Sequence, residues 1–262
     1  MPTLVTEKGI VHYETYGRGR PVILLHGWLG SWALWRKTIE ELGKEFRTYA
    51  LDFIGFGESA DRGAGFTVDT YVELVNQFME KLGIVRAPLI GHSMGGTVSL
   101  GVASRYPNKV VKVAVIGSPI QGSSLNPMLK LSGYKSIADL VFTLPFLRDS
   151  VIYALTHLGT RDGKALYRMV KEDAAKTSPE SFFQSIGTLR KTDLTEQLPQ
   201  LQMPILGIYG RRDIIVSPKQ GKVLLQYAPT SVEAWFESSG HFPMMDEPER
   251  FHKTISDFLN GR

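Results

Sequence analysis

The chain has 262 residues, of which 43% are hydrophobic and 21% are charged, and its formal net charge is +4. These values are typical of a folded globular protein, and they exclude a disordered, collagen-like or low-complexity chain. The absence of cysteine excludes disulfide frameworks, thiolate metal sites and every mechanism with a cysteine nucleophile. Because the net charge is small and the sequence contains no long run of like charges, we expect no nucleic-acid partner.

The beginning of the chain does not have the pattern of a signal peptide, since no basic segment is followed by an apolar one. The longest strongly apolar stretch, 140–147, is interrupted by Pro145. It is far shorter than the roughly 20 residues that a membrane-spanning helix needs. We therefore expect a cytoplasmic protein without an integral membrane segment.

The first half of the chain alternates apolar runs with stretches of helical periodicity. Apolar runs predict strands at 21–25, 46–51, 87–91 and 110–116. Apolar residues at helical spacing predict helices at 68–82 and 95–105. Strands that alternate with helices are typical of βαβ units and of a parallel sheet.

The pattern changes in the middle of the chain. Residues 121–196 have helical periodicity and little that resembles a strand. After Pro204 the alternation resumes, with strands predicted at 205–209 and 232–236 and helices at 218–227 and 247–259. The sequence therefore predicts a core domain of residues 1–120 and 197–262, interrupted by a helical cap of residues 121–196.

The sequence Gly91-His92-Ser93-Met94-Gly95 matches the motif G-x-S-x-G, and it lies between a predicted strand and a predicted helix. The chain must reverse sharply there, and small residues on both sides let the strand and the helix approach each other. The turn exposes the Ser93 hydroxyl at the N-terminus of a helix, where the partial positive charge stabilises a developing oxyanion. Ser93 is therefore the candidate nucleophile.

A serine hydroxyl is a weak nucleophile unless a base takes its proton. His241 is the candidate base, because its loop follows the last predicted strand and reaches the same edge of the sheet. For His26 we expect a structural role in the turn after strand 21–25. The side chain of His92 is expected to point away from Ser93. The remaining histidines, His12, His157 and His252, are expected to be structural or solvated.

The imidazole of the base needs a carboxylate that fixes its tautomer. Asp213 is the candidate, because it follows strand 205–209 at the same edge of the sheet. Asp52 also ends a strand, but the sequence after it is typical of a loop that its first residue caps. Asp246 follows His241 too closely to orient it easily.

Two donors are needed for the negative charge of the transition state. The Met94 backbone N–H, directly after the nucleophile, is one candidate. The other is the Trp28 backbone N–H, in a glycine-containing loop after strand 21–25 whose backbone can come close to a substrate.

Taken together, these residues resemble the α/β-hydrolase fold family, in its cap-bearing branch of serine esterases and lipases. The resemblance rests on five motifs, which run from near the N-terminus to the last predicted helix: His26-Gly27-Trp28, Asp52 with Gly55-Phe56-Gly57-Glu58-Ser59, Gly91-His92-Ser93-Met94-Gly95-Gly96, Gly210 with Asp213, and Gly240-His241-Phe242-Pro243. The order Ser, Asp, His is the one that this family has.

The resemblance implies an α/β fold with an eight-stranded, mostly parallel sheet, flanking helices and a helical cap inserted after the sixth strand. It implies no metal and no organic cofactor. Family members that act on haloalkanes or epoxides have an aspartate at the nucleophile position, so Ser93 argues against both activities.

The expected function is hydrolysis of small-molecule carboxylic esters with hydrophobic acyl or alcohol groups, through an acyl-enzyme on Ser93. Phe142, Phe146 and Tyr153 of the apolar cap are candidate pocket residues. Alternatives with the same triad are a carbon–carbon bond hydrolase, a cofactor-free perhydrolase and, less favoured, a slow-turnover ligand receptor. Measured turnover would distinguish a receptor from an enzyme.

Overall fold

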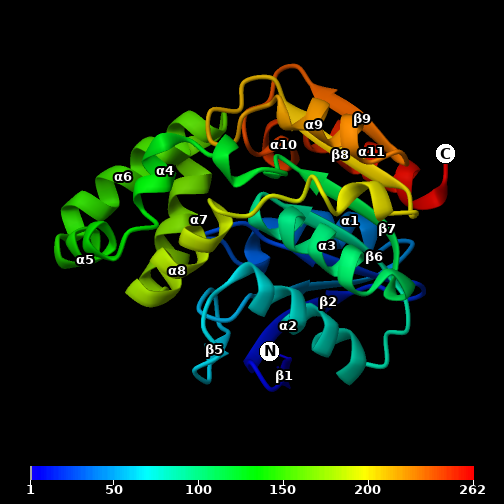
Figure 1. The fold of residues 1–262 in the computed structure, drawn as a ribbon, viewed down its shortest axis with the longest axis horizontal. Helices are drawn as coiled ribbons and strands as arrows, with labels where there is room; N and C mark the ends of the chain where they lie inside the picture. Colours follow the sequence, from blue (N-terminus) through cyan, green and yellow to red (C-terminus); the bar gives the residue numbers. More distant parts are fainter. Residues whose placement is uncertain (1) are drawn as a thin grey trace.

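The computed structural model describes residues 2–262, which form a twisted sheet flanked by helices (Figure 1). The strand order is β1-β2-β4-β3-β6-β7-β8-β9, and the two-residue strand β5 pairs with β2 outside this path. In this spatial order, every neighbouring pair from β4 through β3, β6, β7 and β8 to β9 is parallel. Strand β2 pairs with β1, β4 and β5 in the antiparallel direction. The mostly parallel sheet is confirmed, but the implied number of eight strands is wrong, because within residues 2–262 the short strand β5 adds a ninth. Its strands are β1 (Thr3–Val5), β2 (Gly9–Tyr16), β3 (Pro21–Leu25), β4 (Arg47–Leu51), β5 (Ala60–Asp61), β6 (Ala87–His92), β7 (Val110–Ile116), β8 (Ile205–Gly210) and β9 (Ser231–Phe236).

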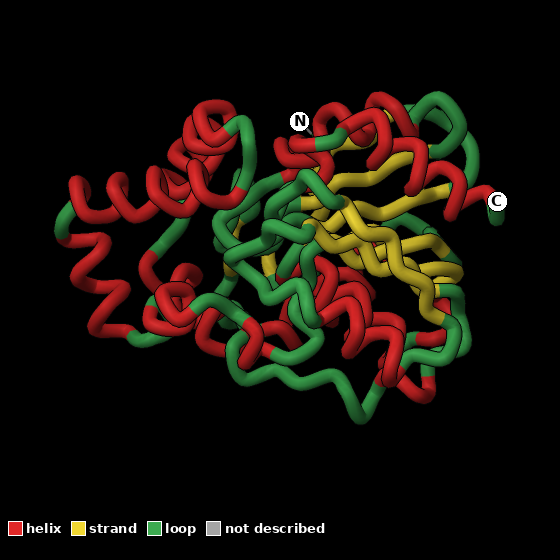
Figure 2. The backbone as a smooth tube through the Cα atoms, turned by 90° about the horizontal axis from the view of Figure 1, so that it is seen from above, coloured by secondary structure: helices red, strands yellow, loops and turns green. Residues whose placement is uncertain are grey.

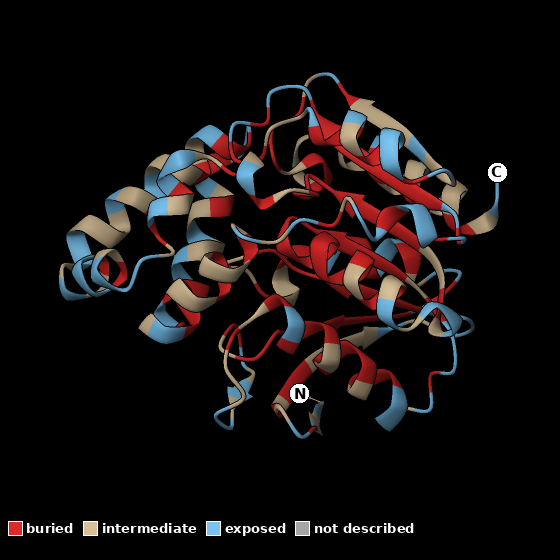
Figure 3. Cartoon of the chain, viewed as in Figure 1, coloured by how far each residue is buried: buried red, intermediate tan, exposed pale blue. Residues whose placement is uncertain are grey.

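Helices cover both faces of the sheet because its central strands are apolar on both sides. In β3, Ile23 and Leu25 belong to the core cluster that includes residues of α2 and α3. Val22 and Leu24 belong to the cluster that includes residues of α1 and α11. Figure 3 shows the resulting buried strands between partly exposed helices. The flanking helices are α1 (Arg36–Leu42), α2 (Val68–Lys81), α3 (Met94–Arg105), α9 (Gln220–Tyr227), α10 (Pro243–Asp246) and α11 (Pro248–Asn260).

The remaining helices lie between β7 and β8 in the chain, and we call them the inserted helices. They gather beyond one end of the strands, beside the sheet rather than on its faces (Figures 1 and 2). Proline occupies the first turn of α4, α6 and α8, where its missing N–H leaves no hydrogen bond unmade. The inserted helices are α4 (Pro127–Leu131), α5 (Lys135–Thr143), α6 (Pro145–Gly159), α7 (Gly163–Lys176) and α8 (Pro179–Leu189).

None of the helices within residues 2–262 combines the length and the apolar character that crossing a membrane requires.

Candidate active site

Ser93 lies at the sharp turn between β6 and α3. Its backbone has φ 52° and ψ −119°, a left-handed conformation that a serine adopts only where the surrounding structure holds it. Its N–H donates to the Ile116 carbonyl of β7 at 2.8 Å, which ties the turn to the neighbouring strand. Because α3 begins at Met94, the positive end of the helix dipole lies directly at the serine.

The two glycines of the G-x-S-x-G sequence permit a close approach of backbones. A Cβ atom at Gly91 would overlap the Gly95 carbonyl, and a Cβ atom at Gly95 would overlap the Leu25 carbonyl of β3. The strand, the turn and α3 therefore pack together at points where no side chain fits.

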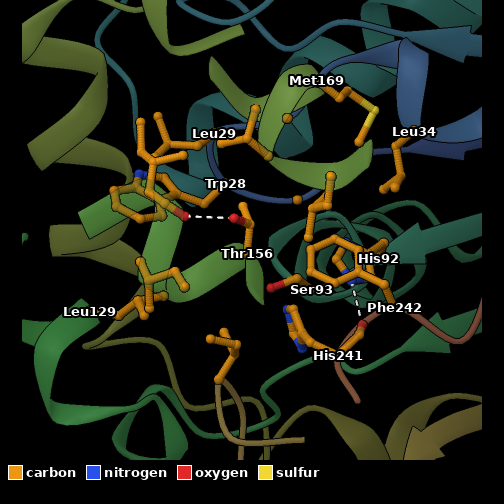
Figure 4. Close-up of a pocket in the computed structure, with 17 residues that line it drawn as sticks. Trp28, Leu29, Leu34, His92, Ser93, Leu129, Thr156, Met169, His241 and Phe242 are labelled. Carbon is orange, nitrogen blue, oxygen red and sulfur yellow. Dashed lines mark hydrogen bonds between the residues drawn. The ribbon is translucent and has the colours of Figure 1, made fainter. Parts of the chain in front are cut away.

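His241 and Asp213 meet at the same edge of the sheet as Ser93, and both are buried. His241 Nδ1 lies 2.7 Å from Asp213 Oδ2. The other carboxylate oxygen accepts the N–H groups of Ile215 and Val216 at 2.8 and 3.0 Å. The carboxylate is thus held facing the ring, so that Nδ1 carries the proton and Nε2 is left as the basic nitrogen. The His241 ring lies beside the Ser93 hydroxyl (Figure 4).

Asp52 is engaged elsewhere. Its carboxylate accepts the N–H groups of Trp32 and Glu58 at 2.6 and 2.9 Å, and it lies 2.9 Å from His12 Nδ1. The hydrogen bond to Asp52 raises the pKa of His12. Asp52 therefore holds the loops on either side of it, and Asp213 is the carboxylate that contacts His241.

The loop after β3 lies against the serine turn. A Cβ atom at Gly27 would be only 3.1 Å from the Ser93 Cβ, so this close approach requires glycine. Leu29 has a positive φ of 55°, which continues the tight turn. Within residues 2–262, the N–H groups of Trp28 and Met94 donate to no loop or side-chain acceptor. The two N–H groups therefore remain candidates for binding an oxyanion.

His26 supports this loop from inside the protein. Its Nδ1–H donates to the Gly27 carbonyl at 2.7 Å, and its Nε2 accepts the Phe53 N–H at 2.9 Å. Burial lowers the pKa of His26, which keeps the ring in this neutral form. These contacts match the structural role expected for it.

The side chain of His92, expected to point away from Ser93, lines the same cavity as Ser93. Its ring packs against the His241 ring with centroids 4.6 Å apart, and both residues line the same cavity (Figure 4). Its Nε2–H donates to the His241 backbone carbonyl at 2.9 Å. Burial, followed by the nearby His241, lowers the pKa of His92 well below its ordinary value. His92 is therefore a neutral support for the His241 loop, a contact that sequence could not show across 149 positions.

A cavity of about 80 Å³ lies around Ser93 and His241, between the sheet edge and the inserted helices. Apart from its glycines, the polar lining is limited to His92, Ser93, Thr156 and His241, and no Lys, Arg, Asp or Glu lines it. The apolar lining residues are Trp28, Leu29, Leu34, Leu129, Ile152, Leu155, Leu166, Met169, Val170, Ile215 and Phe242.

The three residues predicted for the pocket do not line this cavity. Tyr153 and Phe146 are 53% and 69% exposed. Phe142 packs edge-on against Phe182 of α8, with ring centroids 5.2 Å apart. The reason is helical phase, since α6 turns Ile152 and Leu155 toward the cavity and so turns Tyr153 away from it. The apolar periodicity of α6 and α7 was visible in the sequence, but not the face that would meet the core.

Comparison with known proteins places this geometry in a family. The chain is 28% identical over 256 residues to a pimeloyl-[acyl-carrier protein] methyl ester esterase of Vibrio campbellii, covering 95% of this chain and 98% of the relative. A protein with the same name from Aliivibrio fischeri is 28% identical over 260 residues, covering 95% of this chain and 97% of the relative.

Solved structures share the fold at lower sequence identity. A thermophilic esterase from Thermogutta terrifontis superposes with a TM-score of 0.85 at 24% identity, over 99% of this chain and 96% of that one. The enol-lactonase of Burkholderia xenovorans LB400 gives a TM-score of 0.87 at 22% identity, over 99% and 100%. A meta-cleavage product hydrolase of Pseudomonas fluorescens IP01 gives 0.83 at 22% identity, over 100% and 98%.

The family model described as the alpha/beta hydrolase fold matches residues 20–248. The match spans the serine turn, the inserted helices and the loop of His241, and the chain belongs to the α/β-hydrolase fold family.

Proposed function

We propose that this protein is a serine hydrolase that cleaves small-molecule carboxylic esters with apolar acyl or alcohol groups. The observation that carries the proposal is the arrangement of Ser93 at a strained turn beside His241, whose other ring nitrogen is bound to the buried Asp213 carboxylate at 2.7 Å. This arrangement supplies a nucleophile, a general base and a group that orients the base. The names of the esterases that resemble the chain support the same reaction class.

In the proposed mechanism, Ser93 Oγ attacks the acyl carbon while His241 Nε2 takes its proton. Asp213 stabilises the imidazolium that forms. The N–H groups of Trp28 and Met94 hold the negative oxygen of the tetrahedral intermediate. His241 then returns the proton to the departing alcohol oxygen. A water molecule repeats the sequence on the acyl-enzyme and frees Ser93.

The lining of the cavity supports the proposed substrate class. A charged group would lose its hydration there without finding a charged partner, so the part of the substrate within the cavity is proposed to be uncharged and apolar. We further propose that residues 121–196 act as a cap that selects substrates, since α4, α6 and α7 supply much of the lining. The relatives named for a methyl ester on a carrier-bound acyl chain make methyl esters of apolar chains the first substrates to test.

The test compares the wild type with Ser93→Ala on p-nitrophenyl and methyl esters of increasing acyl length. We expect the variant to keep its fold and to lose ester hydrolysis by several orders of magnitude, about the loss seen when a triad nucleophile is removed. Labelling by a fluorophosphonate probe should disappear with it. Ser136→Ala, at an exposed serine of α5, is the matched control.

Near-normal hydrolysis by Ser93→Ala would contradict the proposal. A vinylogous diketone and hydrogen peroxide in the same assays separate ester hydrolysis from carbon–carbon bond hydrolysis and perhydrolysis. Many turnovers per protein molecule distinguish an enzyme from a ligand receptor.

A further inference from the structure

The end of helix α6 packs directly on the loop that carries His241. The His241 N–H donates to the Gly159 carbonyl at 2.8 Å. A Cβ atom at Gly240 would overlap the Gly159 carbonyl oxygen, so the two backbones meet where no side chain fits between them. One inserted helix therefore contacts the backbone of the proposed catalytic base.

Asp246 joins the same two segments through its side chain. One carboxylate oxygen accepts the Thr160 hydroxyl at 2.5 Å and the Arg161 N–H at 2.7 Å. The other oxygen accepts the Gly240 N–H at 2.8 Å. Charge-assisted hydrogen bonds of this kind are stronger than neutral ones. We call Asp246, Gly159, Thr160, Arg161 and Gly240 the α6 latch.

The remaining polar groups of His241 form hydrogen bonds with residues of the sheet edge. His92 Nε2–H donates to its carbonyl at 2.9 Å, and Asp213 accepts from its ring at 2.7 Å. The backbone N–H of His241 and the N–H of the residue before it are the groups that depend on the latch. The position of His241 is thus shared between the sheet edge and α6.

Helix α6 also forms a wall of the cavity. Ile152, Leu155 and Thr156 line it, within two turns of the latch on the same helix. A chain bound in the cavity would therefore press on the rigid element whose end carries the hydrogen bonds to the His241 loop.

We propose that Asp246 is a positioning residue, which couples the filling of the cavity along α6 to the placement of His241. A substrate chain long enough to pack on α6 then accelerates the chemical steps, and does not only strengthen binding. The inference rests on the proposed ester hydrolysis at Ser93. Its physical reason is that binding energy from a remote part of a substrate raises kcat only when it improves the geometry of the reacting groups.

The experiment measures kcat and KM separately for p-nitrophenyl esters from acetate to octanoate. In the wild type, we expect kcat to rise with chain length while KM falls. In Asp246→Ala, we expect kcat for the longer esters to drop about tenfold and to become independent of chain length, as a small misplacement of a reacting group predicts. KM should still fall with chain length, because the cavity lining is unchanged.

Thr160→Val removes one hydrogen bond of the latch without removing the carboxylate. We expect kcat for the longer esters to fall in the same way, by about one third of the loss in Asp246→Ala, since one of several donors to the carboxylate is removed. Asp257→Ala and Thr254→Val on α11 are matched controls, because within residues 2–262 these side chains form hydrogen bonds only within their own helix.

Several results would overturn the coupling. They are a wild-type kcat that does not vary with chain length, an Asp246→Ala profile like that of the wild type, or an equal loss of kcat for all esters. If Asp246→Ala does not fold, the Thr160→Val profile decides. A wild type that neither hydrolyses esters nor reacts with the fluorophosphonate probe would instead contradict the proposed function itself.

Discussion

Three buried histidines lie around Ser93, and their hydrogen bonds give each of them a different role. His26 donates to the loop after β3 and accepts from Phe53, so both of its nitrogens are used in holding backbone. His92 donates to the His241 carbonyl. Of these three histidines, His241 is the one whose Nδ1 lies on a carboxylate. At the scale of single residues, it is the hydrogen-bond partner, and not the residue type, that distinguishes the proposed base from the other two.

Asp173 of α7 is a buried carboxyl group that the proposed mechanism does not use. It is 5% exposed, and one of its oxygens has no hydrogen-bond partner within residues 2–262. Burial raises the pKa of Asp173 to about 7 from an ordinary 3.8; Ser31 and Lys176 oppose the rise, whereas Asp52 and Glu172 add to it. The folded protein therefore binds this proton more tightly than the unfolded chain.

A pH dependence of stability follows from this difference. Between about pH 4 and pH 7 the unfolded chain has released the Asp173 proton and the folded protein still holds it, so stability falls as the pH rises. Above pH 7 the folded protein has released the proton as well, and the stability that proton binding to Asp173 contributes is lost. Asp173→Asn removes this titrating group. The free energy of unfolding of the variant, relative to that of the wild type, should therefore increase by about 2–4 kcal/mol between pH 4 and pH 8.

Chemical denaturation of both proteins at several pH values measures the effect. Asp139→Asn on α5 is the control, because that carboxylate is exposed and paired with Lys135. Parallel pH profiles for wild type and Asp173→Asn would show that the buried carboxyl group does not titrate in this range.

At the scale of elements, the serine turn depends on how closely α3 approaches the sheet. Helix α3 starts directly after Ser93, and its first turn lies on the carbonyl groups of Leu25 and His26. The approach places the N-terminus of α3 directly beside the start of the loop of Trp28. A strand, a helix and a loop thus form one rigid unit.

Gly95→Ala tests this unit. The added Cβ atom would overlap the Leu25 carbonyl and lie 2.6 Å from the His26 carbonyl oxygen, so α3 must shift away from β3. We expect a loss of about 2–4 kcal/mol in stability, typical of overpacking against backbone, together with slower fluorophosphonate labelling of Ser93. Thermal unfolding and labelling rates measure both.

Ser104→Ala in the same helix is the control, because Ser104 lies near the far end of α3. Unchanged stability and labelling in Gly95→Ala would mean that the turn tolerates a wider separation of helix and sheet.

At the scale of the whole molecule, the cavity belongs to two parts of the chain. The sheet edge contributes the proposed reactive groups, and the inserted helices contribute much of the apolar wall. Hydrogen bonds and ion pairs tie the two parts together, among them the Trp28 indole N–H bonded to the Phe182 carbonyl at 3.0 Å, the pair of Lys176 with Glu58 at 2.5 Å and the α6 latch. The inserted helices therefore shape the space beside Ser93, and through the α6 latch they also hold the loop of His241.

Leu155→Trp should shorten the acyl chains that the protein accepts. The larger side chain would fill part of the cavity beside Ser93, so we expect kcat/KM for octanoate to fall at least tenfold while acetate is hydrolysed at a similar rate, a loss of about 1.4 kcal/mol or more. A series of ester lengths measures the change. Leu158→Trp is the matched control, since Leu158 is 60% exposed on another face of α6. Equal profiles for the two variants would show that α6 does not limit the chain.

Local sequence was enough to predict the alternation of strands and helices and the residues that follow the strands. Periodicity and turn residues act over a few positions, so the strand at 87–91, the turn at Ser93 and the helix after it could be read directly. Asp213 and His241 were candidates for the same reason, because the carboxyl ends of parallel strands share one edge of the sheet.

The contacts among distant segments required the folded chain. The face of α6 that meets the cavity, the contact of His92 with His241 and the link from Asp246 to Thr160 each join residues from separate elements. An apolar stripe shows that a helix buries one side, but not which neighbour covers it. For this reason the sequence predicts Phe146 and Tyr153 in the pocket, although both are exposed in the structure. Ile152 and Leu155 form the wall of the cavity instead.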